Sequence, residues 1–140
     1  MANDKLLKLE IVTPQKVLYS GNVVSVSVPG SLSPFQVLYN HAPIVSSLET
    51  GLVKIVDEEN NTRYYAVSPG FTEVHSNKIA ILVDKAEEPS DIDVEVTRTT
   101  IEQLKSKISS ELSQDEKQKI KLQILYEEAK LKAIEKAKSV

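Results

Sequence analysis

The sequence of 140 residues predicts a β + α chain, in which an antiparallel β-sandwich precedes a hairpin of two antiparallel α-helices. All four glycines and all six prolines lie at or before Pro89, whereas residues 90–140 contain neither. Because Gly and Pro mark turns and interrupt helices, this boundary separates two kinds of structure. The hydrophobic period also changes there, from two residues to the spacing of a helix. We therefore predict a sandwich domain over residues 1–86 and a helical domain over residues 87–140.

Short runs rich in Val, Ile and Tyr alternate with turn residues in the first part of the chain. Leu9 and Ile11 recur two residues apart, as do Val24, Val26 and Val28, which is typical of strands with one buried face. Many short strands at this spacing predict an antiparallel sandwich or barrel. The candidate strands are Lys8–Thr13, Lys16–Ser20, Val23–Val28, Gln36–Leu38, Leu52–Val56, Thr62–Val67, Phe71–His75 and Lys78–Val83.

The segment after Pro89 predicts a first helix, because its apolar residues recur at helical spacing. Ser90 or Asp91 is expected to cap the N-terminus of this helix. The apolar residues of its buried face are Val94, Ile101, Leu104, Ile108 and Leu112, with Thr97 between them.

A second helix is predicted to follow a break at residues 113–116, where Ser113 and Glu116 have the spacing of a capping box. The break is short, so the two helices should be antiparallel neighbours. The second helix has two apolar stripes. One stripe is enough for a hairpin, so the other needs the sandwich or a partner. The stripes are Ile120, Ile124, Leu131 and Ile134 on one side, and Leu122, Leu125, Ala129 and Ala133 on the other.

Composition excludes several classes of function. There is no cysteine, which rules out disulfides, thiol nucleophiles and cysteine-ligated zinc. The formal net charge of −3 does not suit nucleic acid, which needs a basic face. Two distant histidines and the lack of a catalytic or phosphate-binding motif predict no metal site, no catalytic residue and no enzymatic activity. Without a long apolar run or a signal-peptide pattern, we expect a soluble protein that reaches a membrane only through partners.

Charge separates the two predicted helices. Residues 85–116 have four basic and nine acidic side chains, and residues 117–140 have seven and three. Exposed ion pairs between such helices are each worth only about 0–1 kcal/mol, so an acidic partner can open the hairpin at little cost. A solvated helix face is the other interpretation of the lysines. The interspersed Glu127, Glu128 and Glu135 weaken a third, a surface for nucleic acid or anionic lipid.

Three segments carry a family resemblance, in order and spacing, over nearly all of residues 8–88. They resemble the signature of the epsilon subunits of F-type ATP synthases, of the bacterial and chloroplast type, the counterparts of mitochondrial delta. The segments are Leu9–Pro14 with Tyr19–Gly21; Phe35–Ile44 with Leu48 and Gly51–Ile55; and Gly70–Val74 with Asn77, Ile79, Ile81, Leu82, Ala86 and Glu87.

The resemblance implies a sandwich of ten strands followed by a helical hairpin. It implies a non-catalytic rotor subunit of the central stalk, which couples the gamma subunit to the c ring of a proton-translocating ATP synthase. The expected location is peripheral, at the cytoplasmic face of a bacterial plasma membrane or the stromal face of a thylakoid. The resemblance also implies an inhibited state, in which the hairpin extends towards the alpha and beta subunits and suppresses ATP hydrolysis. The candidate basic contacts are Lys117, Lys119, Lys121, Lys130 and Lys132.

The resemblance also points to loops that face the c ring. Family members commonly have a glycine-rich loop where this chain has residues 30–36. His41 is interpreted as a loop residue whose ring hydrogen-bonds locally and touches a partner, with a titrating switch as the alternative. His75 is interpreted as an ordinary strand residue. The expected partner contacts are Gly30, Ser31, Leu32, Ser33, Pro34 and His41.

Some bacterial members of this family bind ATP through an Ile-Asp-x-x-Arg-Ala motif and arginines of the second helix. This chain keeps Ile92 and Asp93 but has Val96 at the arginine position. Arg98 lies two residues on, roughly 200° around a helix. The second helix has lysines and no arginine, and lysine lacks the bidentate fork for phosphate. We therefore expect no cofactor and no tight binding of ATP.

Two other classes of function stay open on the sequence. One is a free-standing sandwich adaptor, which would be a stable monomer without affinity for gamma. The other is a ligand sensor whose hairpin clamps a nucleotide, and ATP would then raise its melting temperature with occupancy.

Overall fold

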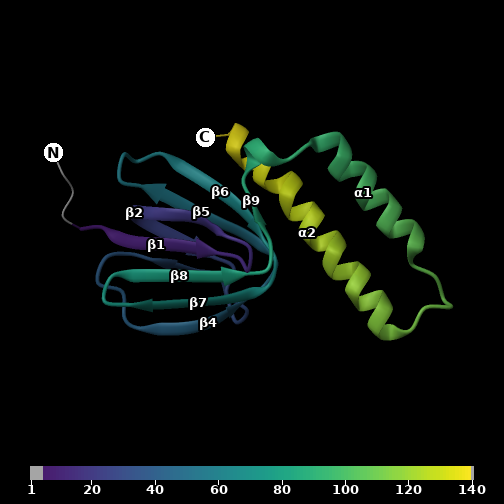
Figure 1. The fold of residues 1–140 in the computed structure, drawn as a ribbon, viewed down its shortest axis with the longest axis horizontal. Coiled ribbons are helices and arrows are strands. Elements are labelled where there is room, and N and C mark those ends of the chain that lie inside the picture. Colours follow the sequence, from purple (N-terminus) through teal and green to yellow (C-terminus); the bar gives the residue numbers. More distant parts are fainter. Residues whose placement is uncertain (1–4, 140) are drawn as a thin grey trace.

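The computed structural model describes residues 5–139 and has the predicted fold class, a β-sandwich followed by a helical hairpin (Figure 1). Nine strands precede a short 3-10 turn, η1 (Pro89–Asp91), and two helices, α1 (Val94–Lys107) and α2 (Gln114–Lys138). The strands are β1 (Leu7–Val12), β2 (Val17–Val28), β3 (Phe35–Val37), β4 (Ile44–Leu48), β5 (Gly51–Asp57), β6 (Thr62–Val67), β7 (Gly70–His75), β8 (Lys78–Val83) and β9 (Ala86–Glu87).

The strands pair in the order β4-β7-β8-β1-β2-β5-β6-β9, with β3 attached to β2. All pairs are antiparallel except β1 with β8, which is parallel. The long strand β2 belongs to both layers of the sandwich, because residues 17–23 pair with β1 and residues 23–27 pair with β5. Its pairing with β5 shifts register between Val23 and Ser25. Such an irregularity bends a strand, so the sheet can fold over itself here.

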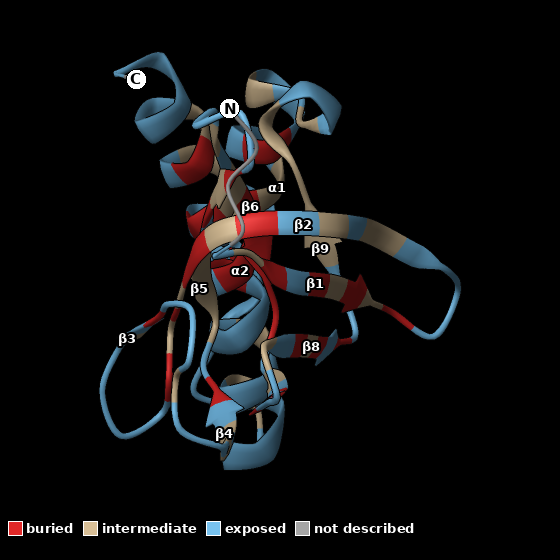
Figure 2. Cartoon of the chain, turned by 90° about the vertical axis from the view of Figure 1, so that its left-hand side faces the viewer, coloured by how far each residue is buried: buried red, intermediate tan, exposed pale blue. Residues whose placement is uncertain are grey.

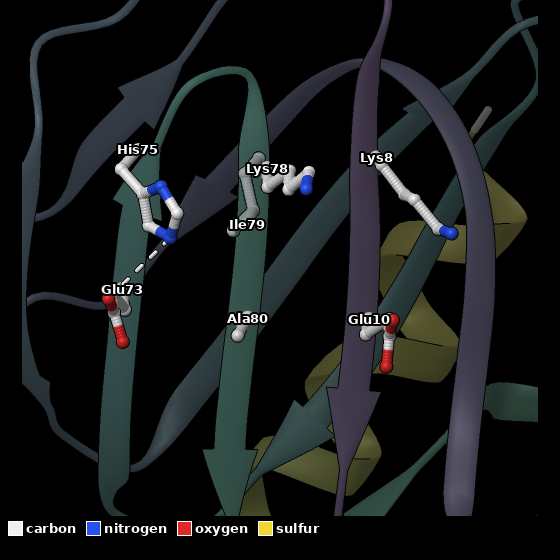
Figure 3. A pocket seen from close by; sticks show the side chains of 7 residues that line it. All are labelled: Lys8, Glu10, Glu73, His75, Lys78, Ile79 and Ala80. Carbon is white, nitrogen blue, oxygen red and sulfur yellow. Dashed lines mark ion pairs between the residues drawn. The ribbon is translucent and has the colours of Figure 1, made fainter.

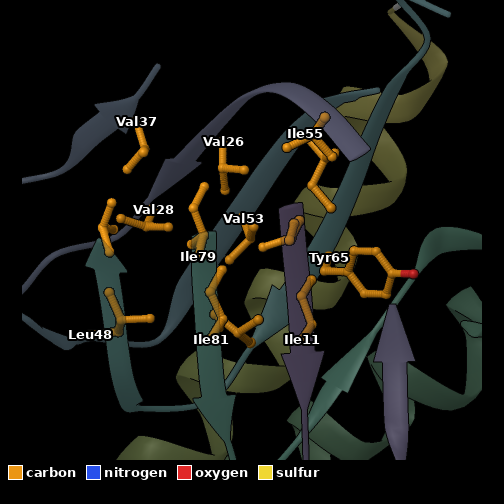
Figure 4. Packing of buried hydrophobic residues seen from close by; sticks show 14 of the residues in the cluster. Ile11, Val26, Val28, Val37, Leu48, Val53, Ile55, Tyr65, Ile79 and Ile81 are labelled. Atoms are coloured by element: carbon orange, nitrogen blue, oxygen red, sulfur yellow. The ribbon is translucent and has the colours of Figure 1, made fainter. Parts of the chain in front are cut away.

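The core lies between the two layers (Figure 4). Val53 and Ile55 of β5 face Ile79 and Ile81 of β8, and all four are at most 2% exposed. One polar side chain in this region, Thr72, is also fully buried, but its hydroxyl donates to the Ala80 carbonyl oxygen at 3.1 Å. The core is therefore apolar where the layers meet, and its buried threonine is satisfied.

Several strand predictions need correction. The separate candidates Lys16–Ser20 and Val23–Val28 form one strand, β2, because the turn residues Gly21 and Asn22 continue the pairing with β1. The register shift also breaks the predicted alternation, so Val23 is buried and Val24 is only half-buried. Strands β4 and β9 were not predicted. Leu48 is the only buried residue of β4, an edge strand, and β9 has two residues, so neither has a clear period.

The helix boundaries also differ in part. Neither Ser90 nor Asp91 caps α1, because residues 89–91 form the turn η1; the cap is Asp93, whose carboxylate accepts from the Val96 amide at 3.0 Å. Helix α1 ends at Lys107 and Ile108 is exposed, so the prediction that Ile108 and Leu112 continue its buried face is wrong. Ser113 caps α2 as predicted and accepts from the Glu116 amide at 3.2 Å.

The two apolar stripes of α2 have different partners. Ile124, with Ile120 and Leu131 beside it, packs on Ile101 and Leu104 of α1 and joins the helices. Ala129 and Ala133 of the other stripe pack on Ala66 of β6, with Leu52, Tyr64 and Ile92 around them. Leu122 and Leu125 of that stripe stay exposed. The second stripe therefore covers the sandwich only along the C-terminal half of α2.

Candidate partner-binding surfaces

The first candidate surface consists of the two loops that flank β3, residues 30–34 and 38–43, which Figure 2 shows mostly as exposed. Leu32 is a fully exposed leucine at the tip of the first loop. Gly30 at its base is buried and bridges to Leu48, and a Cβ at this position would lie 2.5 Å from the Ser33 carbonyl oxygen. Only glycine fits such a close approach of backbone to backbone.

The second loop is tied to the turn between β7 and β8. Asn40 has a positive φ of 64°, and its amide donates to Asn77 Oδ1 at 2.6 Å. His41 Nδ1 lies 2.7 Å from the carbonyl oxygen of Ala42, the local hydrogen bond expected for this ring. The ring centroids of His41 and Phe35 are 6.3 Å apart. Phe35 thus lies between the two loops and brings His41 to the same side of the sandwich as residues 30–34.

A second candidate surface was missed by the sequence analysis. It is the outer face of β4, β7, β8 and β1, where Phe71 pairs with Leu82 and Leu82 lies beside Val12, which pairs with Val17. Phe71 and Leu82 are 58% and 49% exposed, and Val17 is 54% exposed. We call Phe71, Leu82, Val12 and Val17 the apolar row. The alternation in β7 and β8 places Phe71 and Leu82 away from the core, but only the strand pairing shows that Val12 and Val17 join them in one row.

Beyond the apolar row the same face becomes charged (Figure 3). A shallow groove of about 280 Å³ crosses β7, β8 and β1 there. His75 Nε2 lies 3.7 Å from Glu73 Oε1, and both side chains are more than half exposed. His75 is thus an exposed strand residue, as predicted. The groove is lined by Lys8, Glu10, Glu73, His75, Lys78, Ile79 and Ala80.

The five candidate lysines of α2 are in different environments. Lys119, Lys121 and Lys132 are exposed, and Lys117 is half-buried in the first turn. Lys130 is only 14% exposed and contacts two carboxylates, with Nζ 2.9 Å from Glu127 Oε2 and 3.6 Å from Glu87 Oε1. Lys119, Lys121 and Lys132 are thus accessible on the surface, whereas Lys130 is engaged within the chain.

The three residues named for the nucleotide motif lie in different environments. Ile92 packs with the alanines between α2 and β6, and Asp93 is the cap of α1. Arg98 is 64% exposed and its guanidinium lies 3.7 Å from Glu95 Oε1. Ile92 and Asp93 therefore have structural roles, and Arg98 is held on the outside of α1.

Two tyrosines bind the consecutive glutamates Glu87 and Glu88 at the end of the sandwich. Tyr126 of α2 donates from its hydroxyl to Glu87 Oε1 at 2.9 Å, and Tyr65 of β6 donates to Glu88 Oε2 at 2.9 Å. Burial raises the pKa of both phenols well above the usual value, and the hydrogen bond to a carboxylate raises the pKa of each further. Both phenols therefore act as donors at neutral pH.

Neither helix is long and apolar enough to cross a membrane, and residues 5–139 contain no cluster of three or more His, Asp or Glu side chains placed to hold a metal ion.

The fold defines a β-sandwich protein with a docked helical hairpin, which leaves both candidate surfaces exposed. The chain belongs to the ATP synthase delta/epsilon chain family, whose model of the beta-sandwich domain matches residues 6–89. It is similar to the ATP synthase epsilon chain of Leptospira interrogans serovar Lai, with 40% identity over 95 residues that cover 68% of this chain and 74% of that one. It is also similar to the epsilon chain of Brevibacillus brevis, with 35% identity over 108 residues, 77% and 82% of the two chains.

Solved structures share the fold. A chain in the cryo-EM structure of the Euglena gracilis mitochondrial ATP synthase, OSCP/F1/c-ring, superposes with a TM-score of 0.80 at 18% identity, over 93% of this chain and 82% of that one. A chain in the structure of the central stalk and c-ring of the Tetrahymena thermophila enzyme superposes with a TM-score of 0.65 at 17% identity, over 96% and 99% of the two chains. Both likenesses include the helices as well as the sandwich.

Proposed function

We propose that this chain is a non-catalytic rotor subunit of the central stalk of an F-type proton-translocating ATP synthase. It couples the gamma subunit to the c ring and inhibits ATP hydrolysis through its C-terminal helices. The observation that carries the proposal is the family match over residues 6–89, which includes the strands and loops of both candidate surfaces. The peripheral site of action is the cytoplasmic face of a bacterial plasma membrane, or the stromal face of a thylakoid.

The two surfaces suit two different partners. The loop at residues 30–34 is mostly exposed and carries Leu32 at its tip, which fits a contact with the c ring through a small area. The apolar row and the charged groove form a broad face across four strands, which fits gamma. An exposed apolar stripe rimmed by charges is typical of a protein–protein interface.

The helices supply the inhibitory contact. Lys119 and Lys121 are exposed on the first half of α2, beyond the part that covers the sandwich, and Leu122 and Leu125 beside them are also exposed. Acidic residues of alpha or beta subunits would pair with these lysines in the inhibited state. ATP is not needed as a regulatory ligand in this proposal, because Arg98 lies outside and the second helix lacks arginine.

The test is ATP hydrolysis by a matching catalytic complex that lacks its epsilon subunit, measured before and after addition of the full-length protein. Binding is measured in parallel by co-sedimentation. We expect the wild type to bind and to suppress hydrolysis. A variant with Lys119 and Lys121 changed to Glu should bind but inhibit less, whereas a variant with Phe71 and Leu82 changed to Asp should not bind.

The matched controls are Lys136→Glu with Lys138→Glu, two lysines in the last turn of α2, and Val96→Asp, an exposed valine of α1. Both controls should bind and inhibit like the wild type. If the wild type does not bind, the rotor assignment is wrong. If it binds without inhibition, the chain is a rotor subunit whose helices do not regulate.

A further inference from the structure

Helix α2 meets the sandwich through polar side chains as well as through its alanines. Ala129 and Lys130 lie three and four residues after Tyr126, and Ala133 lies four and three residues after them, so the four residues share one face of the helix. This face meets β6 and β9, where Ala66 pairs with Glu87. The acidic side chain of β9 is therefore next to the alanine contact, at the point where the chain leaves the sandwich.

Glu87 joins β9 to two residues of α2 through a single oxygen. Its Oε1 accepts from the Tyr126 hydroxyl at 2.9 Å and lies 3.6 Å from Lys130 Nζ. The Lys130 ammonium is also 5.8 Å from the centroid of the Tyr126 ring, and that of Lys85 is 5.7 Å from it on the sandwich side. Tyr126 is only 5% exposed, so these contacts are largely shielded from water.

The neighbouring carboxylate has a different set of partners. Glu88 accepts from the Tyr65 hydroxyl at 2.9 Å and from the Ser90 hydroxyl at 2.8 Å, and both partners precede the helices. Of these two consecutive glutamates, Glu87 thus ties the sandwich to α2, whereas Glu88 ties the sandwich to the start of the connecting segment.

We propose that Glu87, Tyr126 and Lys130 form a latch that holds the hairpin on the sandwich and controls its release. A hydrogen bond to a charged group and a shielded ion pair are stronger than exposed pairs. When the hairpin leaves, Glu87 loses both partners on α2, while Lys130 keeps Glu127. The latch thus opens without leaving a lysine unpaired. Its use in regulation rests on the proposed function, whereas the docking itself is a property of the isolated chain.

The test is hydrogen–deuterium exchange of the full-length chain, read separately on α1, α2 and the sandwich strands. In Glu87→Ala and in Tyr126→Phe, exchange of the helix amides should be roughly 10- to 100-fold faster, the range expected for a hydrogen bond to a charged group. Amides of β1 and β8 should keep their protection, which shows that the sandwich is folded. The double variant should exchange no faster than Glu87→Ala alone, because both changes remove the same bond.

Glu88→Ala is the matched control, and its helix amides should exchange like those of the wild type. The proposal is overturned if Glu87→Ala and Tyr126→Phe leave helix exchange unchanged, or if Glu88→Ala speeds it equally. Inhibition of ATP hydrolysis by the same variants forms a separate arm, in which a released hairpin should inhibit more strongly. Faster exchange without any effect on hydrolysis would keep the latch and contradict the regulatory part of the proposed function.

Discussion

Substitution of Gly70 by Ala tests how closely the strands pack where β7 begins. A Cβ at this position would overlap the carbonyl oxygen of Leu82 and lie 2.8 Å from Val83 Cγ1. Ordinary carbon contacts need about 3.5 Å, so β7 and β8 must separate at the Gly70–Val83 pair. Overpacking of this kind costs about 1–3 kcal/mol. For a chain of this size the change lowers the melting temperature by roughly 3–15 °C.

The assay is urea unfolding of the full-length protein, followed by far-UV circular dichroism, with thermal melting as a second measurement. Gly21→Ala is the matched control, because a Cβ there meets only Tyr19 atoms at 3.6 Å or more. This control should be neutral or more stable by about 0.4–1 kcal/mol, since alanine restricts the unfolded chain. A Gly70→Ala variant as stable as Gly21→Ala would refute the close approach of β7 to the Leu82 carbonyl.

Three further predictions concern the cap, the core and the two tyrosines. Asp93→Ala should cost about 0.5–2 kcal/mol and speed exchange of the first amides of α1, because the Val96 amide loses its acceptor; unchanged exchange there would contradict the cap. Ile81→Ala should lower the free energy of unfolding by about 2–5 kcal/mol in urea, because the side chain is fully buried; a loss below 1 kcal/mol would contradict that burial. Tyr65 and Tyr126 keep their protons in the folded chain above pH 10, where the unfolded chain loses them, so stability should fall above that pH by up to about 1.4 kcal/mol per pH unit for each tyrosine. Replacement of both tyrosines by Phe should flatten this fall, and an equally steep fall in the double variant would contradict the raised pKa values.

The sandwich was predictable from the sequence where burial imposes a period. Strands β7 and β8 alternate buried and exposed residues without interruption, and their predicted positions agree with the structure to within one residue. The period of two does not hold where one strand belongs to both layers. In β2 the alternation of buried and exposed residues is interrupted at the register shift near Val23. It also fails at the edge strand β4, because one buried residue cannot define a period.

The candidate surfaces could be predicted only in part. The loops around β3 were located by the family resemblance, and the local hydrogen bond of His41 follows from its place in a loop. The apolar row was not predicted, since Val12 and Val17 join Phe71 and Leu82 only through strand pairing. The latch could not be predicted from the sequence either, because Glu87 and Tyr126 are 39 residues apart and meet only in the folded chain. Sequence periodicity describes one element at a time, whereas these surfaces arise from pairing between elements.

The contact between hairpin and sandwich differs from the sandwich core in a way that bears on release. The core buries large aliphatic side chains completely, whereas Ala129 and Ala133 bring one methyl group each to Ala66. A buried methyl or methylene group is worth only about 0.8 kcal/mol, so a seam of alanines holds a helix weakly. The Glu87 latch adds about 1.5–3 kcal/mol, the range for a hydrogen bond to a charged group. The docked and released states then differ by only a few kcal/mol, the range in which a partner can shift the balance while the sandwich stays folded.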